Sequence, residues 1–280
     1  MEEWQRLEIH YSKLLRESNA SVRRTLYRRA YSAVSELVKK SFESNKPEDR
    51  TSGTSKQLVR MLKKMVNKTD KVLEIGSGRG YTCLALSPFV KSITGIEVSK
   101  PSVEESLKLF SQRRITNVNI EDISALELDT HFRFNEFDLC LSIDVIEHLH
   151  PEDAREHIYQ TLQILKPGGR YIIVMPNRLN GPHDLTKRVF PEAKYALGFH
   201  LNESTYREII KIMSLAGYDE FKVFYNCNFF SMRKKLIILP FQFALLTEKI
   251  YQKFPMRMKM LEKYLPIHLI AYKPNSKYIS

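Results

Sequence analysis

The sequence predicts an α/β fold in which an open, largely parallel sheet carries helices on both faces. Two observations predict it. Short apolar runs alternate with helical patterns between residues 71 and 177, and a glycine-rich turn directly follows the first run. The chain has 280 residues, 43% of them hydrophobic, which is enough for one large core with appended elements.

The first 50 residues predict a helical cap. Apolar side chains recur there at helical spacing in two runs. The runs are Trp4, Leu7, Tyr11, Leu14 and Leu15, and then Leu26, Ala30, Val34, Leu37 and Val38. Residues 46–55 form a polar linker, in which Thr54 or Ser55 is expected to cap the helix that leads to the first strand.

The first predicted strand, residues 71–75, runs directly into three glycines at alternate positions. These glycines are Gly76, Gly78 and Gly80. Glycine allows a sharp strand-to-helix turn and lets a ligand approach the backbone closely. Residues 81–86 then read as the start of a helix, and Glu74 stands where a carboxylate can meet a cationic amino group.

Four further strands are expected, over residues 92–98, 117–123, 137–143 and 165–177. The second strand ends in Glu97, about 20 residues past the glycine turn, where an acid can hold both hydroxyls of a ribose. The third ends in Asp122. Acids at the carboxyl ends of neighbouring parallel strands predict a ligand at the point where the strand order reverses.

As a set, these residues resemble the motifs of the class I S-adenosylmethionine (SAM) methyltransferases over roughly residues 55–225. The resemblance implies a Rossmann-like, seven-stranded sheet with SAM as the cofactor, and it implies that Asp122 pairs with the adenine amino group. The residues expected to bind SAM are Glu74, Gly76, Ser77, Gly78, Gly80, Tyr81, Glu97, Val98, Asp122, Ile123 and Ser142.

The catalytic residues are expected directly after the fourth strand. Asp144, Glu147 and His148 have i, i+3 and i+4 spacing, which favours convergence on one side of a turn entering a helix. Two carboxylates and an imidazole suit Mg²⁺ or Mn²⁺. The alternative is that Glu147 and His148 orient the substrate without a metal, with His148 as the general base.

The same segment is similar to the E-x-x-E-H site of two families, the coenzyme-Q O-methyltransferases and the small-RNA 3′-terminal 2′-O-methyltransferases. The resemblance to the RNA family implies that His200 is a fourth metal ligand. Asp144 departs from both families, which have Glu there. His183 is either a second acid/base candidate or part of a solvated turn, and residues 178–200 form the expected acceptor loop.

The last two strands are predicted at residues 221–225 and 269–272, with about 40 residues between them. The sequence therefore divides into a cap (1–50), a SAM-binding domain (51–225), an insert (226–266) and a last strand with its tail (267–280). The insert mixes aromatic, Met and basic residues, which suits a lid over an apolar acceptor or a surface on anionic lipid; packing on the core is the alternative.

The net charge of +12 is unevenly distributed. Residues 1–70 carry +7 and residues 221–280 carry +9, which leaves −4 for the middle of the chain. Basic segments of this kind usually form solvated faces, and attraction of an anionic partner is the alternative. A charged start, single cysteines (Cys83, Cys140, Cys227) and no long apolar stretch predict a reduced, cytoplasmic protein, peripheral at a membrane if the insert contacts lipid.

Three functions are compatible with these features. The first is O-methylation of a hydroxyl on a small molecule, a glycan or a lipid-linked intermediate, which the acidic and imidazole-bearing site favours. The second is RNA 2′-O-methylation, supported by the basic charge and the His200 match. The third is a non-catalytic SAM-domain scaffold that contacts a membrane through residues 226–266.

Overall fold

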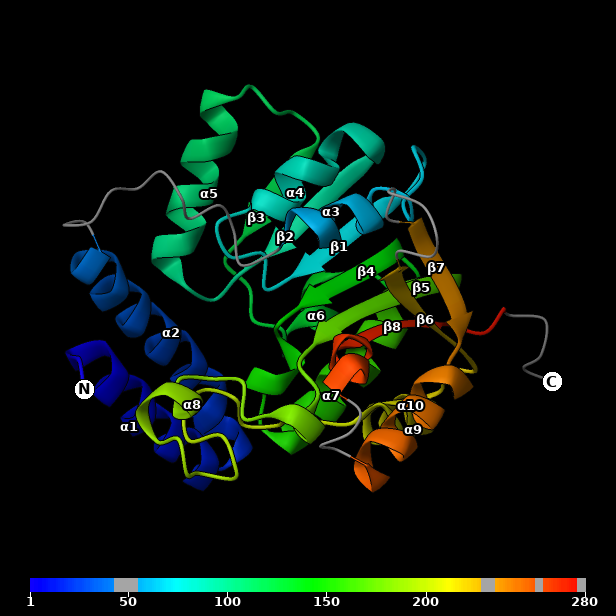
Figure 1. The fold of residues 1–280 in the computed structure, drawn as a ribbon. Coiled ribbons are helices and arrows are strands. Elements are labelled where there is room, and N and C mark those ends of the chain that lie inside the picture. The colour runs from blue at the N-terminus through cyan, green and yellow to red at the C-terminus, as the bar shows by residue number, and fades with distance from the viewer. Residues whose placement is uncertain (43–54, 228–234, 255–258, 276–280) are drawn as a thin grey trace.

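The predicted α/β architecture is confirmed by a computed structural model, which describes residues 1–42, 55–227, 235–254 and 259–275 (Figure 1). A single sheet has the strand order β3-β2-β1-β4-β5-β8-β6-β7. The strands are β1 Lys71–Ile75, β2 Ser92–Ile96, β3 Val118–Glu121, β4 Phe137–Ile143, β5 Leu165–Met175, β6 Glu220–Cys227, β7 Lys235–Pro240 and β8 Ile267–Tyr272.

The first five strands are parallel, and β6, β7 and β8 join them by antiparallel pairing. The strand order reverses between β1 and β4, so the loops after these two strands diverge to opposite sides and leave a crevice at their carboxyl ends. The site residues that follow β1 and β4 therefore border the same crevice.

Helices cover both faces of the sheet (Figure 1). One core packs α3, α4 and α5 against one face, and a second packs α7, α9 and α10 against the other. The α-helices are α1 Glu3–Glu17, α2 Ala20–Phe42, α3 Lys56–Leu62, α4 Tyr81–Leu86, α5 Lys100–Gln112, α6 Leu128–His131, α7 Pro151–Ile164, α8 Thr186–Val189, α9 Tyr206–Ala216 and α10 Gln242–Lys253. None in the described residues is long and apolar enough to cross a bilayer.

Several local predictions are confirmed. The Ser55 hydroxyl accepts a hydrogen bond from the Leu58 N–H at 3.1 Å and so caps α3, whereas Thr54 lies outside the described residues. Cys83 and Cys140 are buried free thiols. The side chain of Cys227 lies outside the described residues.

The two N-terminal helices pack on the second core and are fixed by a buried ion pair. The Arg23 guanidinium of α2 donates to both carboxylate oxygens of Asp153 in α7, at 2.6 and 2.7 Å. The Tyr27 hydroxyl donates to the same carboxylate at 2.8 Å and accepts from the His150 N–H. This network places one side of α2 against the carboxyl ends of the strands.

The expected count of seven strands is corrected to eight. Residues 235–240, which the sequence assigns to the insert, pair with β6 as the edge strand β7. The backbone N–H and C=O groups of this segment form hydrogen bonds with β6. The segment therefore extends the sheet and does not form a lid over the acceptor. The helix α10 follows, while residues 228–234 and 255–258 of the insert lie outside the described residues.

Candidate active site

Two adjoining cavities lie at the carboxyl ends of the strands. The first is lined from α2, the glycine turn and the ends of β2, β3 and β4, and the second from the ends of β4 and β5 and the loops before α9 and β8. Asp144 and His148 line both cavities, so the two meet at these side chains.

The glycine turn reaches the first cavity at Gly76. Gly76, Gly78 and Gly80 all have a left-handed backbone, with φ of 67°, 52° and 73°. A Cβ on Gly76 would lie 2.5 Å from the Val145 side chain, whereas a Cβ on Gly78 would meet no atom of the described residues within 4 Å. Gly76 is therefore required by packing, and the free space beside Gly78 is available to a ligand.

Glu97 is held rigidly at the edge of the first cavity. Its carboxylate accepts hydrogen bonds from the N–H groups of Gly78 (2.9 Å), Val98 (2.8 Å) and Ser99 (2.8 Å). Burial raises the pKa of Glu97, and these three bonds oppose that effect by stabilising the carboxylate. The cavity thus has one fixed acceptor where the sequence expects the ribose.

Asp122 lies beside the cavity and pairs with a different partner. Its carboxylate, at the end of β3, forms an ion pair with the Arg28 guanidinium of α2. Ile123 lines the cavity, together with Ser124 and Ala125, which the sequence analysis did not single out. Adenine pairing by Asp122 remains a prediction.

Three further SAM-binding candidates have other surroundings. Glu74 is buried beside α4, where the Cys83 thiol donates to its carboxylate at 2.8 Å, and burial raises the pKa of Glu74 to about 7. Ser142 is buried and accepts a hydrogen bond from the Tyr171 hydroxyl at 3.0 Å. Tyr81 begins α4, and none of the three lines the first cavity.

Ser77 holds the glycine turn against the neighbouring strand. Its N–H donates to the Ile96 carbonyl at 2.9 Å, and its side chain is buried. The hydroxyl has no hydrogen-bond partner among the described residues. Ser77 therefore contributes to the turn through its backbone, while its hydroxyl lies buried against Gly95 of β2.

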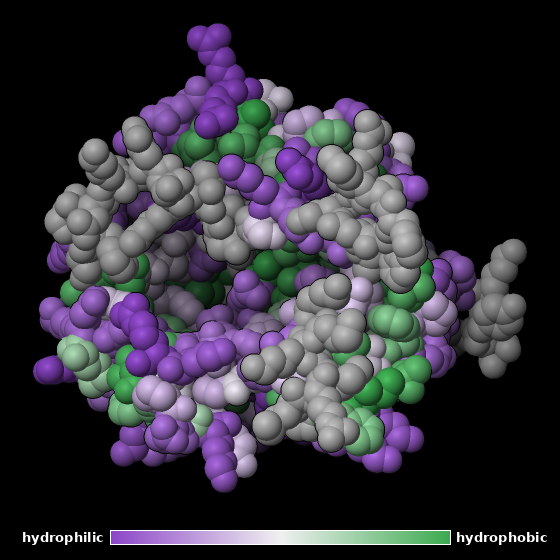
Figure 2. Space-filling view, viewed as in Figure 1, coloured by the Kyte–Doolittle hydropathy of each residue, from purple (hydrophilic) through white to green (hydrophobic). Residues whose placement is uncertain are grey.

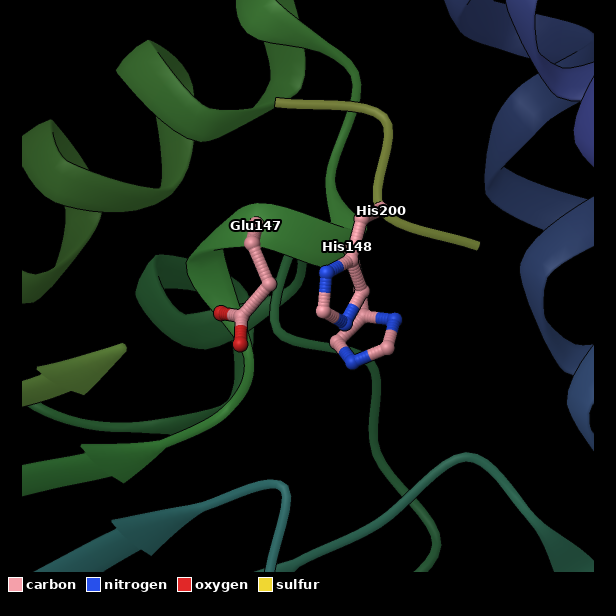
Figure 3. A group of neighbouring side chains, drawn as sticks. All are labelled: Glu147, His148 and His200. Carbon is pink, nitrogen blue, oxygen red and sulfur yellow. The ribbon is translucent and has the colours of Figure 1, made fainter. Parts of the chain in front are cut away.

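Glu147, His148 and His200 come together in the second cavity (Figure 3). One ligand atom from each lies within 4.8 Å of the others. Asp144 is not one of these three, but its side chain interacts with that of Glu147 and lines the same cavity. Its backbone is left-handed (φ 53°) and precedes the short 3₁₀ turn Ile146–His148. Asp144, Glu147 and His148 therefore converge on one cavity as their spacing suggested, although a left-handed residue and a 3₁₀ turn carry them instead of an α-helix.

Several polar atoms of this group are buried but form no hydrogen bond within the described residues. Glu147 is fully buried, neither of its oxygens has a donor in the described residues, and the ring Nδ1 of His148 is likewise unpaired. Burial, and then the nearby Asp144 carboxylate, raise the pKa of Glu147. Burial, and then His200, lower the pKa of His148 to about 3, so this imidazole is neutral. Asp144 faces open solvent in the cavities, yet enough protein surrounds its carboxylate to raise its pKa too.

His200 is oriented by a carboxylate that the sequence analysis missed. Its Nδ1 lies 2.7 Å from the Glu203 carboxylate, and its ring meets that of His148 edge-on with centroids 4.8 Å apart. Glu203 also accepts from the His183 N–H at 2.7 Å. Its i+3 spacing from His200 was the available signal.

His183 lines the second cavity but its ring is already engaged. The Nε2 atom lies 3.0 Å from the Asn177 carbonyl and 3.1 Å from the Asn180 side-chain oxygen. A ring held by two acceptors is more suited to shaping the cavity than to moving a proton.

The N-terminal helices contact the first cavity and the loop that carries His200. Tyr27 and Tyr31 of α2 line the first cavity, and Tyr31 packs edge-on against His148 at 5.8 Å between ring centroids. From α1, the Arg16 guanidinium donates to the carbonyls of Ala196 and His200, both at 3.0 Å. The cap therefore positions the loop that carries His200.

Comparisons with known proteins agree with this geometry. A family model described as a methyltransferase domain matches residues 72–169, which include the glycine turn, Glu97 and the Asp144–His148 segment. The chain carries a class I SAM-dependent methyltransferase domain.

Curated relatives of this chain include methyltransferases whose names differ in the acceptor, and one whose name gives none. The chain is 30% identical over 104 residues to the uncharacterized methyltransferase YcgJ of Bacillus subtilis, covering 37% of this chain and 40% of the relative. It is 28% identical over 120 residues to EEF1A lysine methyltransferase 2 of Danio rerio, covering 40% and 50%. It is 26% identical over 112 residues to a ubiquinone biosynthesis O-methyltransferase of Coxiella burnetii, covering 40% and 45%.

The methyltransferase spans half or less of the length of these three relatives. The solved structure of YcgJ superposes with a TM-score of 0.52 at 18% identity, covering 78% of this chain and 98% of that one. This likeness shows the fold, and it leaves the acceptor to be argued from the site.

The free space at Gly78 gives a test of the SAM pocket. We expect Gly78→Val to abolish measurable SAM binding in calorimetry, because a β-branched side chain would occupy the space that the ligand needs. Gly168→Val is the matched control for backbone strain, since φ is also left-handed there but this exposed glycine of β5 lines neither cavity and its new side chain would meet the Asn275 side chain. A folded Gly78→Val protein with undiminished SAM affinity would overturn the assignment.

Proposed function

We propose that this methyltransferase transfers the methyl group of SAM to a hydroxyl oxygen on a small molecule, a glycan or a lipid-linked intermediate. The observation that carries the proposal is the buried Glu147 carboxylate, which has no hydrogen-bond donor in the parts of the chain that the structure describes and lies beside two histidines in the second cavity. A carboxylate and a neutral imidazole favour an acceptor that must lose a proton as it reacts.

The reaction is an in-line displacement. The acceptor oxygen attacks the methyl carbon, the O–CH₃ bond forms as the S–CH₃ bond breaks, and S-adenosylhomocysteine leaves with the sulfur electron pair. The hydroxyl proton passes to a base, for which Glu147 and His148 are the candidates. Since Asp144 and His148 line both cavities, they lie where a methyl group on one side would meet an acceptor on the other.

The residues of the second cavity also fit a divalent cation. Among the described residues, the Glu147 oxygens and His148 Nδ1 have no well-aligned hydrogen bond and can serve as ligand atoms. Glu203 holds His200 by its Nδ1, an arrangement common behind metal-bound histidine. Glu147, His148 and His200 would hold Mg²⁺ or Mn²⁺, with Asp144 close by. Such a cation lowers the pKa of a coordinated hydroxyl.

A second candidate function is 2′-O-methylation of RNA. It is favoured by the inclusion of His200 in the group with Glu147 and His148, and by the net charge of +12. Here the ribose 2′ oxygen would be the acceptor.

An acceptor panel separates these candidates. The enzyme is incubated with methyl-labelled SAM and, in turn, a catechol, a short RNA with a free 3′ end and a lysine peptide. We expect label on the catechol, in an ether that resists mild hydrolysis. Label on the RNA alone would favour the second candidate, and label on the lysine peptide alone would overturn O-methylation.

Dependence on a cation is tested separately. We expect chelation to abolish methyl transfer and Mg²⁺ or Mn²⁺ to restore it. His200→Ala should raise the metal concentration needed by about tenfold or more, because one ligand is lost. His131→Ala, at an exposed histidine on α6, is the control and should leave that concentration unchanged. Full activity of metal-free, chelator-treated enzyme would leave Glu147 and His148 as acid/base and positioning residues.

A further inference from the structure

The outward side of α10 carries an exposed apolar stripe. Phe243 is 38% exposed and Leu246 is 56% exposed; Phe254, directly after the helix, is 46% exposed. With the half-buried Ile250, these positions follow i, i+3, i+7 and i+11 spacing, so they lie along one side of the helix. The opposite side packs on the protein through Ala244, Thr247, Glu248 and Tyr251.

The charge on this helix is also divided between its two sides. Glu248 is the only acidic residue from Lys235 to Phe254, and it is buried, where it accepts hydrogen bonds from the Asn177 amide (2.7 Å) and the Tyr206 N–H (2.6 Å). Lys249 and Lys253 are exposed, and no carboxylate among the described residues pairs with either. The solvent side of α10 is therefore apolar and cationic at once.

The neighbouring strand extends this surface. The edge strand β7 contacts α10 and contributes Lys235 and the 45%-exposed Ile238. In Figure 2, hydrophobic residues gather beside hydrophilic ones on the lower right of the molecule, where Figure 1 places α9 and α10. We call the set of Lys235, Ile238, Phe243, Leu246, Lys249, Lys253 and Phe254 the α10 face.

We propose that the α10 face docks the protein on an anionic lipid bilayer. Exposed aromatic and aliphatic side chains gain free energy by entering the interface between headgroups and acyl chains, and the flanking lysines gain by approaching anionic headgroups. A second copy of the chain is a poorer partner, because it would bring the same three lysines to the contact and a net charge of +12.

The position of the face suits an acceptor that resides in the membrane. Glu248, on the buried side of α10, bonds to the Asn177 side chain, and the Asn177 carbonyl bonds to His183 in the second cavity. One helix thus separates the proposed lipid contact from the acceptor cavity. Docking itself does not depend on the proposed reaction and is measured without turnover.

The test is co-sedimentation of the full chain with lipid vesicles. We expect binding to vesicles of mixed phosphatidylcholine and phosphatidylglycerol, weakening as salt is added, and little binding to phosphatidylcholine alone. Leu246→Ser/Lys249→Glu should weaken binding by about tenfold or more. Its matched control, Leu107→Ser/Lys108→Glu, changes an exposed leucine and lysine on α5 and should bind like the unmodified chain.

Three outcomes would overturn the proposal. The first is that the unmodified chain does not bind the mixed vesicles. The second is that the α10 and α5 variants lose binding equally, which would mean that overall positive charge, and not the α10 face, attracts the protein to the lipid. The third is a concentration-dependent dimer that the α10 variant alone abolishes in the absence of vesicle binding, which would assign the face to self-association. Circular dichroism of both variants checks that each remains folded.

Discussion

Asp153→Ala should lower the free energy of unfolding by about 3–5 kcal/mol, measured by denaturant titration. Arg23 is only 1% exposed and Asp153 only 2%, so removing the carboxylate leaves a buried guanidinium without its main counter-charge. The same change removes the acceptor of the Tyr27 hydroxyl. Because Tyr27 lines the first cavity, SAM affinity should fall as well.

Glu156→Ala is the matched control for this prediction. Glu156 also lies on α7 and also pairs with an arginine of α2, Arg24, but that pair is more than a third exposed on each side. Exposed ion pairs contribute roughly 0–1 kcal/mol, so this variant should be nearly as stable as the unmodified protein. Equal losses in the two variants would mean that burial of the Arg23 pair is not what attaches the cap.

Glu147→Gln and His148→Ala should each reduce the rate of methyl transfer by about 10²–10⁴-fold while SAM affinity stays within a few-fold. Both residues line the acceptor cavity, and within the described part of the chain the Glu147 oxygens and His148 Nδ1 are buried without an aligned hydrogen-bond donor or acceptor. Single-turnover kinetics measure the first quantity and calorimetry the second.

Glu192→Gln serves as the control for loss of a carboxylate, since Glu192 is exposed in the acceptor loop. It should alter neither quantity. If His148→Ala lowers SAM affinity and transfer rate to the same degree, His148 belongs to the cofactor pocket and the proposed division between the two cavities is wrong.

Much of the fold is predictable from local pattern. The apolar runs, the glycine turn and the strand-terminal acids predicted the parallel half of the sheet, because each is dictated by burial or by backbone conformation within a few residues. The edge strand β7 was not predicted. Its apolar run is compatible with a strand, a lid or a membrane contact. The choice depends on its pairing with β6, which local sequence pattern does not determine.

The site shows the same division. The spacing of Glu147 and His148 placed them in one cavity, and the resemblance added His200. Glu203, Tyr27 and Tyr31 were missed, because their relevance depends on how α2 and the loop before α9 pack against the sheet. The sequence alone also does not tell which side of α10 is exposed. The structure shows this, because other residues of the helix are the ones buried against the protein.

The backbone of Asp144 supplies a reason for its departure from the Glu found in the families that the segment resembles. At φ 53° a side chain crowds its own backbone, and aspartate, with asparagine, is enriched in this conformation compared with longer side chains. The Asp144 N–H also donates to the Val174 carbonyl at 2.9 Å, which ties this backbone to the end of β5. The left-handed backbone at this position thus favours the shorter acid. Asp144→Asn should therefore preserve the turn better than Asp144→Glu, even though only Asp144→Glu keeps the negative charge.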